Sequence, residues 1–211
     1  MPRPAMRTIV YVDGFNLYYR AVRNTPWKWL DLNALFRTVL GPSHQITRIK
    51  YFTARVSAEP NNPSKPQRQD AYLRALKACS PPVSLHFGRF VTRRTRAQLA
   101  NPRSGRRTVQ ILRTEEKGTD VNLAAHLLDD AWRDRYDVAV VVSNDGDLAE
   151  AVRLAKLAGK RVGVANPSRG HASNALRAQA DFVRQIRQGA LRSSQLPDPI
   201  PGTSIAKPPN W

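Results

Sequence analysis

The hydrophobic residues of this chain are concentrated in short continuous runs, a pattern typical of strands that are buried on both faces of a sheet. Residues 8–12 (TIVYV) form one such run, and residues 137–143 (DVAVVVS) form another. Shorter or more mixed apolar stretches predict four further strands, at residues 46–54, 83–91, 108–114 and 161–165.

The segments between these strands have the spacing and the end signals of helices. Residues 15–23 are expected to form a short helix, and Asp31 is placed to cap a second helix that ends at Gly41. A third helix follows a proline-rich loop and runs to about Cys79. Because helices alternate with buried strands, we predict an α/β fold, a three-layer sandwich with a central, mostly parallel sheet.

Two helices are expected on either side of the strand at residues 137–143. The first begins at Thr119, the expected cap, and has apolar residues at the spacing i, i+4, i+7 and i+11. We expect this stripe to face the core; its residues are Val121, Ala125, Leu128 and Trp132. The second helix, at residues 147–158, is expected to end at Gly159.

Length and charge restrict the number of domains and the class of partner. The 211 residues favour one domain, at residues 1–190. The 34 Lys and Arg against 16 Asp and Glu give a net charge of +18, which favours nucleic acid as the partner. A membrane partner is not expected, because there is neither an amphipathic basic helix nor an apolar run of membrane-spanning length. The single cysteine and the lack of a recognisable signal peptide favour a reducing, cytoplasmic location.

Two segments differ from the rest of the chain. Residues 93–107 (RRTRAQLANPRSGRR) contain six arginines and no acid, and we interpret them as an exposed arm or hairpin loop inserted in the domain. Such an arm can contact phosphates, although a charge run is as often a solvated surface. The candidate RNA-binding residues are Arg93, Arg94, Arg96, Arg103, Arg106 and Arg107. Residues 191–211 are polar and proline-rich, so a disordered tail is expected.

Polar residues directly follow the two most hydrophobic strands, and ligands bind beyond the carboxyl ends of parallel strands. Residues 13–16 (DGFN) follow the first strand, and residues 144–147 (NDGD) follow the second. Residues 117–120 (KGTD) open the helix that leads into the second strand. Each segment also has an ordinary structural explanation, as a turn, a helix cap or a first-turn acid.

Acids from several segments at one edge of the sheet would repel each other and raise their pKa values unless a cation lay among them. A site with carboxylates and no cysteine suits Mg²⁺ or Mn²⁺ rather than Zn²⁺. Beside a basic surface, such a site suggests phosphodiester hydrolysis, in which the metal lowers the pKa of a water and offsets the developing charge. The pattern does not distinguish one ion from two.

Three segments, in this order and at this spacing, resemble the signature segments of NYN domains, a branch of the PIN-like nucleases that includes LabA-like proteins. They are residues 10–16 (VYVDGFN), 116–122 (EKGTDVN) and 143–148 (SNDGDL). Residues 172–183 resemble the last helix and strand of the family, so that the resemblance covers residues 7–187. It implies a PIN-like, Rossmann-like fold and a metal-dependent endoribonuclease that acts on RNA, single-stranded RNA in particular.

Carried over residue by residue, the resemblance implies a role for each matching position. The acidic, metal-binding positions are Asp13, Asp120, Asp145 and Asp147. Asn16 matches the asparagine that orients the first aspartate or a substrate phosphate, and Ser143 and Asn144 match small polar residues that support the metal site. Lys117 is a candidate phosphate contact or a solvated loop lysine. Leu148 departs from the phenylalanine that these domains often have there.

Other functions were compared with this one. A haloacid-dehalogenase-type phosphatase needs a second aspartate two residues after the first, but Phe15 stands there. The four histidines are spread over different segments, which disfavours histidine catalysis. A non-catalytic RNA-binding or regulatory protein, with a protein partner or a second copy of itself, would fit the basic charge equally well. The candidates for stacking on unpaired bases are Phe15, Tyr18, Tyr19, Trp27 and Trp29. Core packing is the better expectation for most of them, Tyr18 and Tyr19 included, and Trp27 and Trp29 are the more plausible stacking pair.

Overall fold

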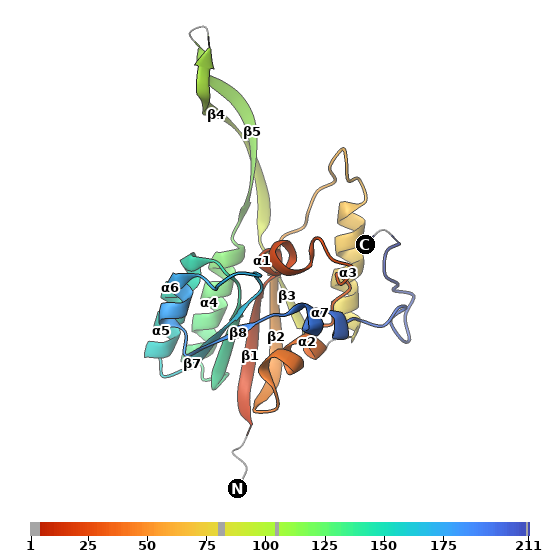
Figure 1. Ribbon diagram of the computed structural model, residues 1–211, viewed down its shortest axis with the longest axis vertical. Helices are drawn as coiled ribbons and strands as arrows, with labels where there is room; N and C mark the ends of the chain where they lie inside the picture. The colour runs from red at the N-terminus through yellow and green to blue at the C-terminus, as the bar shows by residue number, and fades with distance from the viewer. Residues whose placement is uncertain (1–4, 80–82, 104–105, 210) are drawn as a thin grey trace.

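A computed structural model describes residues 5–79, 83–103, 106–209 and 211 of the chain. At its centre is a six-stranded parallel sheet with the order β3-β2-β1-β6-β7-β8 (Figure 1). Its strands are β1 (Met6–Asp13), β2 (His44–Thr53), β3 (Val83–Phe87), β6 (Val138–Val142), β7 (Arg161–Asn166) and β8 (Phe182–Gln185). The predicted parallel sheet is confirmed.

Helices cover both faces of the sheet, which makes the predicted three-layer sandwich. One face carries α1 (Gly14–Leu17) with its π-helical continuation η1 (Tyr18–Val22), α2 (Leu32–Leu40), α3 (Lys65–Cys79) and α7 (Gln188–Ser193). The other face carries α4 (Thr119–Trp132), the 3₁₀ turn η2 (Gly146–Leu148), α5 (Ala149–Leu157) and α6 (Asn174–Gln179). In the ranges that the structure describes, none of these helices is long and apolar enough to span a membrane.

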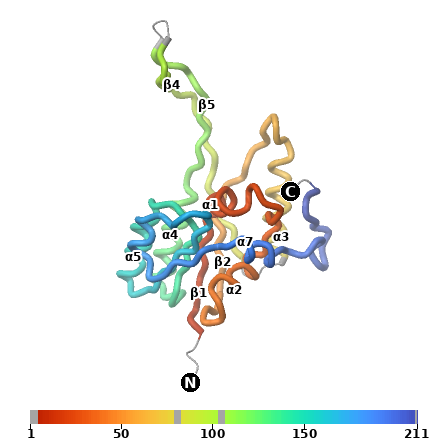
Figure 2. The backbone as a smooth tube through the Cα atoms, in the orientation of Figure 1, coloured from red at the N-terminus to blue at the C-terminus, as the bar shows by residue number. Residues whose placement is uncertain are grey.

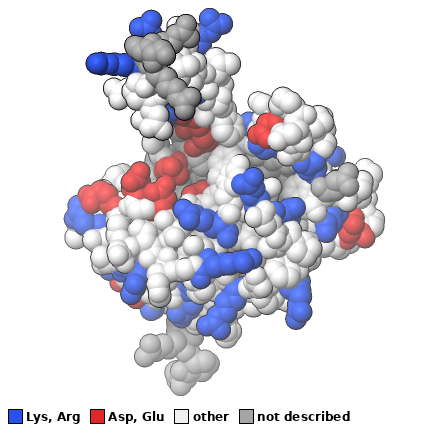
Figure 3. Space-filling view, turned by 45° about the horizontal axis from the view of Figure 1, so that its top comes forward, with Lys and Arg blue, Asp and Glu red and all other residues white. Residues whose placement is uncertain are grey.

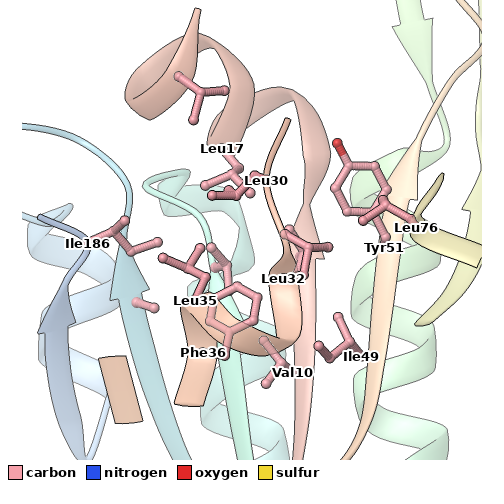
Figure 4. Packing of buried hydrophobic residues seen from close by; sticks show 14 of the residues in the cluster. Val10, Leu17, Leu30, Leu32, Leu35, Phe36, Ile49, Tyr51, Leu76 and Ile186 are labelled. Carbon is pink, nitrogen blue, oxygen red and sulfur yellow. The ribbon is translucent and has the colours of Figure 1, made fainter. Parts of the chain in front are cut away.

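Alternate residues of the central strands point into two separate cores. Val10 and Val12 of β1 belong to the core beneath α2 and α3, whereas Ile9 and Tyr11 belong to the core beneath α4 and α5. Figure 4 shows the first core, in which side chains of α2 lie close to Val10. Because both faces of β1 and β6 are buried, their sequences are continuous apolar runs.

The arginine-rich segment forms a long antiparallel hairpin. Its strands β4 (Arg89–Arg103) and β5 (Arg106–Lys117) pair with each other and, within the described ranges, with no strand of the central sheet. The hairpin stands clear of the rest of the domain in Figures 1 and 2. The arm at residues 93–107 is therefore exposed as expected, but it is built largely of paired strands rather than of a loop.

The carboxyl-terminal segment differs from the disordered tail that its composition predicts. Leu196 and Ile200 are buried in the first core, and the carbonyl of Pro197 accepts a hydrogen bond from Nε1 of Trp29 at 3.1 Å. The Trp211 ring packs 6.0 Å from the Trp29 ring, centroid to centroid. A few large apolar side chains thus hold the segment against the domain, and its prolines reduce the entropy that ordering costs.

The apolar stripe that we expected to bury α4 lies instead on the exposed side of the helix. Val121 and Trp132 are 71% and 72% exposed, whereas Leu123 and Leu127 are fully buried beneath the helix. Both sets of residues have helical spacing, so periodicity alone did not choose between them. The burial of the two leucines against the sheet determines the orientation of α4.

The order of strands in the sheet has a switch point between β1 and β6. With the hairpin left aside, the order is that of a doubly wound sheet, and the chain winds in opposite directions from these two strands. Ligands bind in such sheets beyond the carboxyl ends of the strands at this switch point. Asp13 ends β1 and Ser143 follows β6, so the predicted site residues meet at this place.

Candidate active site

The buried carboxylate of Asp13 joins the ends of two neighbouring strands. Its Oδ1 accepts the backbone N–H of Asn16 at 2.9 Å, which makes Asp13 the N-cap of α1. Its Oδ2 accepts the hydroxyl of Ser143 at 2.9 Å. The helix begins close to β2, because a Cβ on Gly14 would lie only 2.6 Å from the ring of Tyr51. These contacts hold the Asp13 carboxylate in one orientation.

The loop after β6 is tied to the loop after β1. The backbone N–H of Asn144 donates to Oδ1 of Asn16 at 3.0 Å, and the backbone N–H of Asp145 donates to Oγ of Ser143 at 3.1 Å. Asp145 also caps η2, since its Oδ1 accepts the backbone N–H of Asp147 at 3.0 Å. The two aspartate-bearing loops are therefore held side by side by their own polar residues.

The third acidic segment lies where β5 leads into α4. The N-cap of α4 is Gly118, with a φ of 96° that favours glycine, so the predicted cap at Thr119 is wrong. The backbone N–H and the hydroxyl of Thr119 both donate to Oε1 of Glu116, the former at 3.1 Å. Asp120 follows in the first turn of the helix. Glu116 thus supplies the capping acceptor that we had expected from the hydroxyl of Thr119.

All three segments line one pocket of about 340 Å³ at the base of the hairpin. The pocket brings together Asp13, Asn16, Asp120 and Asp145, as the sequence predicted. Figure 3 shows acidic side chains gathered below the hairpin, with basic side chains spread over the surface beside them. We refer to this cavity as the acidic pocket.

The acidic pocket also contains residues outside the predicted set of catalytic, metal-binding and supporting residues. These are Phe15, Tyr19, Arg20, Phe90, Glu116 and Thr119. Glu116 stands inside the NYN-like segment at residues 116–122, so its position could have been found. Phe90 could not, because its place depends on the register that pairs it with Glu116. For Tyr19 core packing was expected, but this ring is 50% exposed.

Four predicted residues lie beside the acidic pocket and do not line it. Ser143 is fully buried behind Asp13, and Asn144 holds the segment before α6 by accepting the backbone N–H of Ser173 at 2.5 Å. Asp147 is exposed at the outer side of η2. The Lys117 ammonium forms an exposed ion pair with Glu115 at 3.1 Å, which accounts for its position without a ligand. The carboxylates that directly face the pocket are those of Asp13, Glu116, Asp120 and Asp145.

The carboxylates of the acidic pocket raise one another's pKa values. Burial raises the pKa of Asp13, and the nearby charge of Asp145 adds to this, although hydrogen bonds from Asn16 and Ser143 oppose it. Burial, then the charges of Asp13 and Asp145, raise the pKa of Asp120 to about 6. A cation among these groups would offset this repulsion.

The side chains of the acidic pocket suit a metal ion by the type of their atoms and not by the distances between them. Within the described ranges, no three His, Cys, Asp or Glu side chains are already arranged to hold an ion. The groups that face the pocket are oxygen donors, which are the ligands that Mg²⁺ and Mn²⁺ prefer. The residues present therefore fit a hard divalent cation that is bound through small side-chain movements or through water.

The register of the hairpin divides its arginines between two faces. Arg94 lies opposite Leu112 and Arg96 opposite Gln110, on the face that begins with Phe90 and Glu116 at the acidic pocket. Arg93 lies opposite Arg113 on the other face. Arg107 is exposed, and the side chains of Arg103 and Arg106 lie outside the described part of the structure. The predicted arm is thus not uniform, because only some of its arginines share the pocket-side face.

The aromatic residues differ from our expectation. Trp29 is 1% exposed and belongs to the core, and Trp27 packs against that core, so the predicted stacking pair is wrong. Two of the other stacking candidates, Phe15 and Tyr19, line the acidic pocket, together with Phe90, which was not a candidate. Phe15 lies 6.4 Å from Tyr19 and 5.7 Å from Phe90, centroid to centroid. The aromatic surface at the pocket therefore comes from α1, η1 and the hairpin.

Two histidines that lie far apart in the sequence are neighbours in the structure. The rings of His86 on β3 and His126 on α4 are 4.2 Å apart, centroid to centroid. Nδ1 of His126 lies 3.3 Å from the Lys50 ammonium, which forms a buried ion pair with Asp130 at 2.6 Å. Neither histidine lines the acidic pocket. We had expected the histidines to be scattered, and this pair is the exception.

Comparisons with known proteins agree on the fold and differ in the activity that their names suggest. Over 98% of its length the chain is 32% identical to the 6-hydroxy-3-succinoylpyridine 3-monooxygenase of Pseudomonas putida, of which it covers 75%. It also resembles the crystal structure of a Vibrio parahaemolyticus protein of unknown function, with a TM-score of 0.55 and 21% identity over 89% of this chain and 97% of the other. That second likeness supports the α/β fold alone. The NYN domain model, a family whose members are generally nucleases, matches residues 7–186, and the chain therefore belongs to the NYN domain family.

Proposed function

We propose that this protein is a divalent-metal-dependent ribonuclease that hydrolyses phosphodiester bonds of single-stranded RNA in the acidic pocket. The observation that carries the proposal is the convergence of carboxylates from three separate segments, those of Asp13, Asp120 and Asp145, in one pocket. These acids are kept together in spite of their mutual repulsion, which a bound cation would offset. Membership in a family of nucleases supports the same conclusion.

The metal would be held by Asp13, Asp120 and Asp145, with Asp147 near enough to add to the negative field. When bound, the ion would lower the pKa of the attacking water and offset the charge that develops on the phosphate. Ser143 and Asn16 would keep the Asp13 carboxylate oriented through the hydrogen bonds that they make to it. Supporting contacts of this kind commonly decide metal affinity and activity.

Other groups of the chain would bind the RNA itself. Arg20 lines the acidic pocket and is exposed, so its guanidinium is available for a phosphate next to the one that is cleaved. The rings of Phe15, Tyr19 and Phe90 offer surfaces for unpaired bases. Arg94 and Arg96 continue this surface along the hairpin, beyond the reach of a small substrate. These features favour a polynucleotide substrate.

Incubation of the purified protein with labelled single-stranded RNA tests the proposal directly. Cleavage is expected with Mg²⁺ or Mn²⁺, is expected to stop with EDTA, and is expected to be lost in Asp145→Asn and Asp120→Asn. Asp129→Asn, the same chemical change in an exposed acid at the other end of α4, is the matched control. Cleavage of a circular RNA, which has no ends, would show the endonucleolytic mode.

Two results would contradict the proposal. Tight RNA binding without cleavage under any of these metals would favour a regulatory RNA-binding protein on the same fold. Cleavage that persists in EDTA and in both site variants would place the activity elsewhere, or in a contaminant.

A second candidate function rests on the relative that is named as a monooxygenase. With 32% identity over 98% of this chain, monooxygenation of a small pyridine-containing acid, the reaction in the relative's name, is the activity to compare. Such a reaction puts one atom of O₂ into the substrate and reduces the other to water, so it needs a two-electron donor. Oxygen uptake with 6-hydroxy-3-succinoylpyridine and NADH tests it. Uptake that depends on the aromatic acid, with no RNA cleavage, would replace the nuclease proposal.

A further inference from the structure

A second cavity of about 410 Å³ adjoins the acidic pocket. Phe15 and Tyr19 line both cavities, so these two rings form the wall between them. The second cavity is further enclosed by η1, by the start of α3 and by Trp211 at the carboxyl-terminal end of the chain. A cavity of this size accommodates a ligand of one or two rings. The two cavities are thus neighbours on the two sides of this pair of rings.

The second cavity has a basic lining without matching acids. Lys28 is half-buried, and in the described part of the chain no hydrogen-bond or ion-pair partner accepts from its ammonium group. Arg68 donates to the neutral side-chain oxygens of Asn62 and Ser64. The acid of the lining, Glu59, is already paired with Lys65 at 2.5 Å. Among the described residues that line the cavity, no acid therefore remains to neutralise the charges of Lys28 and Arg68.

The position of Lys28 is electrostatically unfavourable unless an anion is present. Burial lowers the pKa of Lys28, and the nearby charges of Arg68 and Lys207 lower it further. Bringing cations together and partly removing them from water costs free energy, and an anion bound among them offsets this cost. Arg23, which also lines the cavity, is exposed and makes no ion pair among the described residues. Lys28, Arg68 and Arg23 are thus the anion-binding groups of the cavity.

The same cavity also has aromatic residues in its lining, which offer planar apolar surfaces beside the basic groups. Tyr18, Tyr72 and Trp211 line it, and the rings of Tyr72 and Trp211 are 5.7 Å apart, centroid to centroid. Nε1 of Trp211 is buried and, within the described ranges, has no hydrogen-bond partner. An orphaned buried donor is unusual in a folded protein, and an acceptor on a bound ligand would satisfy it.

We propose that the second cavity binds one nucleotide of the RNA, next to the nucleotide held in the acidic pocket, with its phosphate on Lys28, Arg68 and Arg23 and its base against Tyr18 and Trp211. The inference rests on the proposed ribonuclease function. The shared ligand chemistry is that of a nucleoside phosphate, an anion attached to an aromatic ring that carries acceptors. The RNA would pass from one cavity to the other over the exposed ring of Tyr19.

Calorimetric titration of the full chain with 5′-AMP, without divalent metal, tests the site separately from cleavage. AMP is expected to bind, and Lys28→Gln is expected to weaken binding by about tenfold or more, since a charge-assisted contact to phosphate is lost. Lys77→Gln removes the same charge at the far end of α3, outside the cavity, and is expected to leave the affinity within about twofold. Thermal unfolding of both variants checks that they fold.

Two further titrations compare AMP with inorganic phosphate and with RNA. Inorganic phosphate is expected to bind at least about tenfold more weakly than AMP, because it lacks the base. A five-nucleotide RNA is expected to displace AMP from the Asp145→Asn variant, which identifies the site as part of the RNA path. Failure of the RNA to compete would mean a site for free mononucleotides and would overturn the proposal.

Three further results would overturn it. They are AMP affinity that does not change in Lys28→Gln, phosphate that binds as tightly as AMP, and 6-hydroxy-3-succinoylpyridine that displaces AMP and binds more tightly. If AMP binding depends on Lys28 but the protein cleaves no RNA, the nuclease proposal fails and the nucleotide site stands. The two failures are therefore distinguishable.

Discussion

The hydroxyl of Ser143 donates a hydrogen bond to Oδ2 of Asp13 at 2.9 Å and thereby links the carboxyl ends of β6 and β1. Both side chains are buried, so water does not replace this contact easily. The same Oγ accepts the backbone N–H of Asp145 at 3.1 Å. One hydroxyl therefore positions two of the carboxylates that face the acidic pocket.

Ser143→Ala is expected to keep the fold and to lower metal-dependent RNA cleavage by about 10- to 100-fold, the usual cost of removing a contact that supports a metal ligand. Without the hydroxyl, the pKa of Asp13 rises further and its carboxylate is less well oriented. Titration of cleavage with Mn²⁺ measures the effect, and more metal should be needed for half-maximal rate. Ser193→Ala, at an exposed serine of α7, is the control. Equal activity of the two variants would show that the hydrogen bond has no role in the site.

The central sheet and the acidic loops could be predicted from sequence because each depends on local patterns. β1 and β6 are buried on both faces, so their continuous apolar sequences identify them as strands. Asp13 and Asp145 lie at or just after the ends of those sequences. The position of Phe90 in the acidic pocket could not be predicted, because it depends on which residue of β5 lies opposite it. A register of this kind is fixed by pairing across a turn, which no single segment encodes.

The face of α4 that packs against the sheet is another feature that could not be predicted from local patterns. Val121 and Trp132 have helical spacing on α4, as do Leu123 and Leu127, but the leucines pack against the sheet. The carboxyl-terminal segment shows the same limitation, since average composition predicts disorder while Leu196 and Ile200 are buried in the core and anchor the segment there. In both cases the structure of the segment depends on the part of the domain that it packs against, which the sequence of the segment alone does not reveal.

The buried ion pair between Lys50 and Asp130 is expected to be essential for stability. The ammonium and the carboxylate are 2.6 Å apart at 4% and 0% side-chain exposure, and Tyr11 donates its hydroxyl to the same carboxylate at 2.6 Å. Asp130→Asn would leave the Lys50 charge buried without its counterion, which costs about 3–5 kcal/mol of unfolding free energy. Urea denaturation at neutral pH measures this loss.

The neighbouring residue offers a matched control for that experiment. Asp129 forms exposed ion pairs with Arg133 and Arg135, and exposed pairs contribute about 0–1 kcal/mol. Asp129→Asn is therefore expected to unfold at nearly the same urea concentration as the unmodified chain. If Asp130→Asn were equally harmless, the buried pair would contribute no net stability.

The same pair gives a pH dependence with a definite sign. Burial raises the pKa of Asp130, but hydrogen bonds from Lys50, Tyr11 and Arg135 outweigh it and hold the pKa below its usual range. The unfolded chain then binds a proton on this carboxyl at a higher pH than the folded protein does. Its stabilising effect is complete above the unfolded pKa of about 4 and is lost as the pH falls through the folded value. Unfolding free energies measured from pH 6 downwards should fall less steeply in Asp130→Asn.

His86 is expected to make the protein less stable below neutral pH. Burial, and then the nearby charges of His126 and Lys50, lower the pKa of His86 from 6.5 to about 4, while Asp130 opposes the shift. Between these values the unfolded chain binds the proton and the folded protein does not, so stability falls as the pH drops from about 6.5 towards 4. Because the ring is partly exposed, solvent screening limits the effect to about 1–2 kcal/mol.

His86→Gln, which stays neutral throughout, should remove this part of the pH dependence. Thermal unfolding at pH 7 and at pH 5 measures it, and the difference between the two midpoints should be smaller than in the unmodified chain. His171→Gln, at an exposed position, should behave like the unmodified chain. An unchanged difference in His86→Gln would mean that another group titrates in this range.

The hairpin is expected to bind RNA through one of its two faces. Arg94 and Arg96 share a face with Phe90 and Glu116, which line the acidic pocket, while Arg93 and Arg113 lie opposite each other on the other face. The double variant Arg94→Ser with Arg96→Ser is expected to weaken RNA binding and to reduce the slope of log affinity against log salt by about 1.4, or 0.7 for each phosphate contact to a single strand.

The double variant Arg93→Ser with Arg113→Ser removes the same charge from the same hairpin, and so separates the face from the overall charge. It is expected to leave the slope nearly unchanged, because no phosphate contact is lost. Fluorescence anisotropy with a labelled single-stranded RNA, in the Asp145→Asn background that prevents cleavage, measures both variants over a range of salt concentrations. Equal slopes for the two double variants would show that the RNA responds to the charge of the hairpin and not to its pocket-side face.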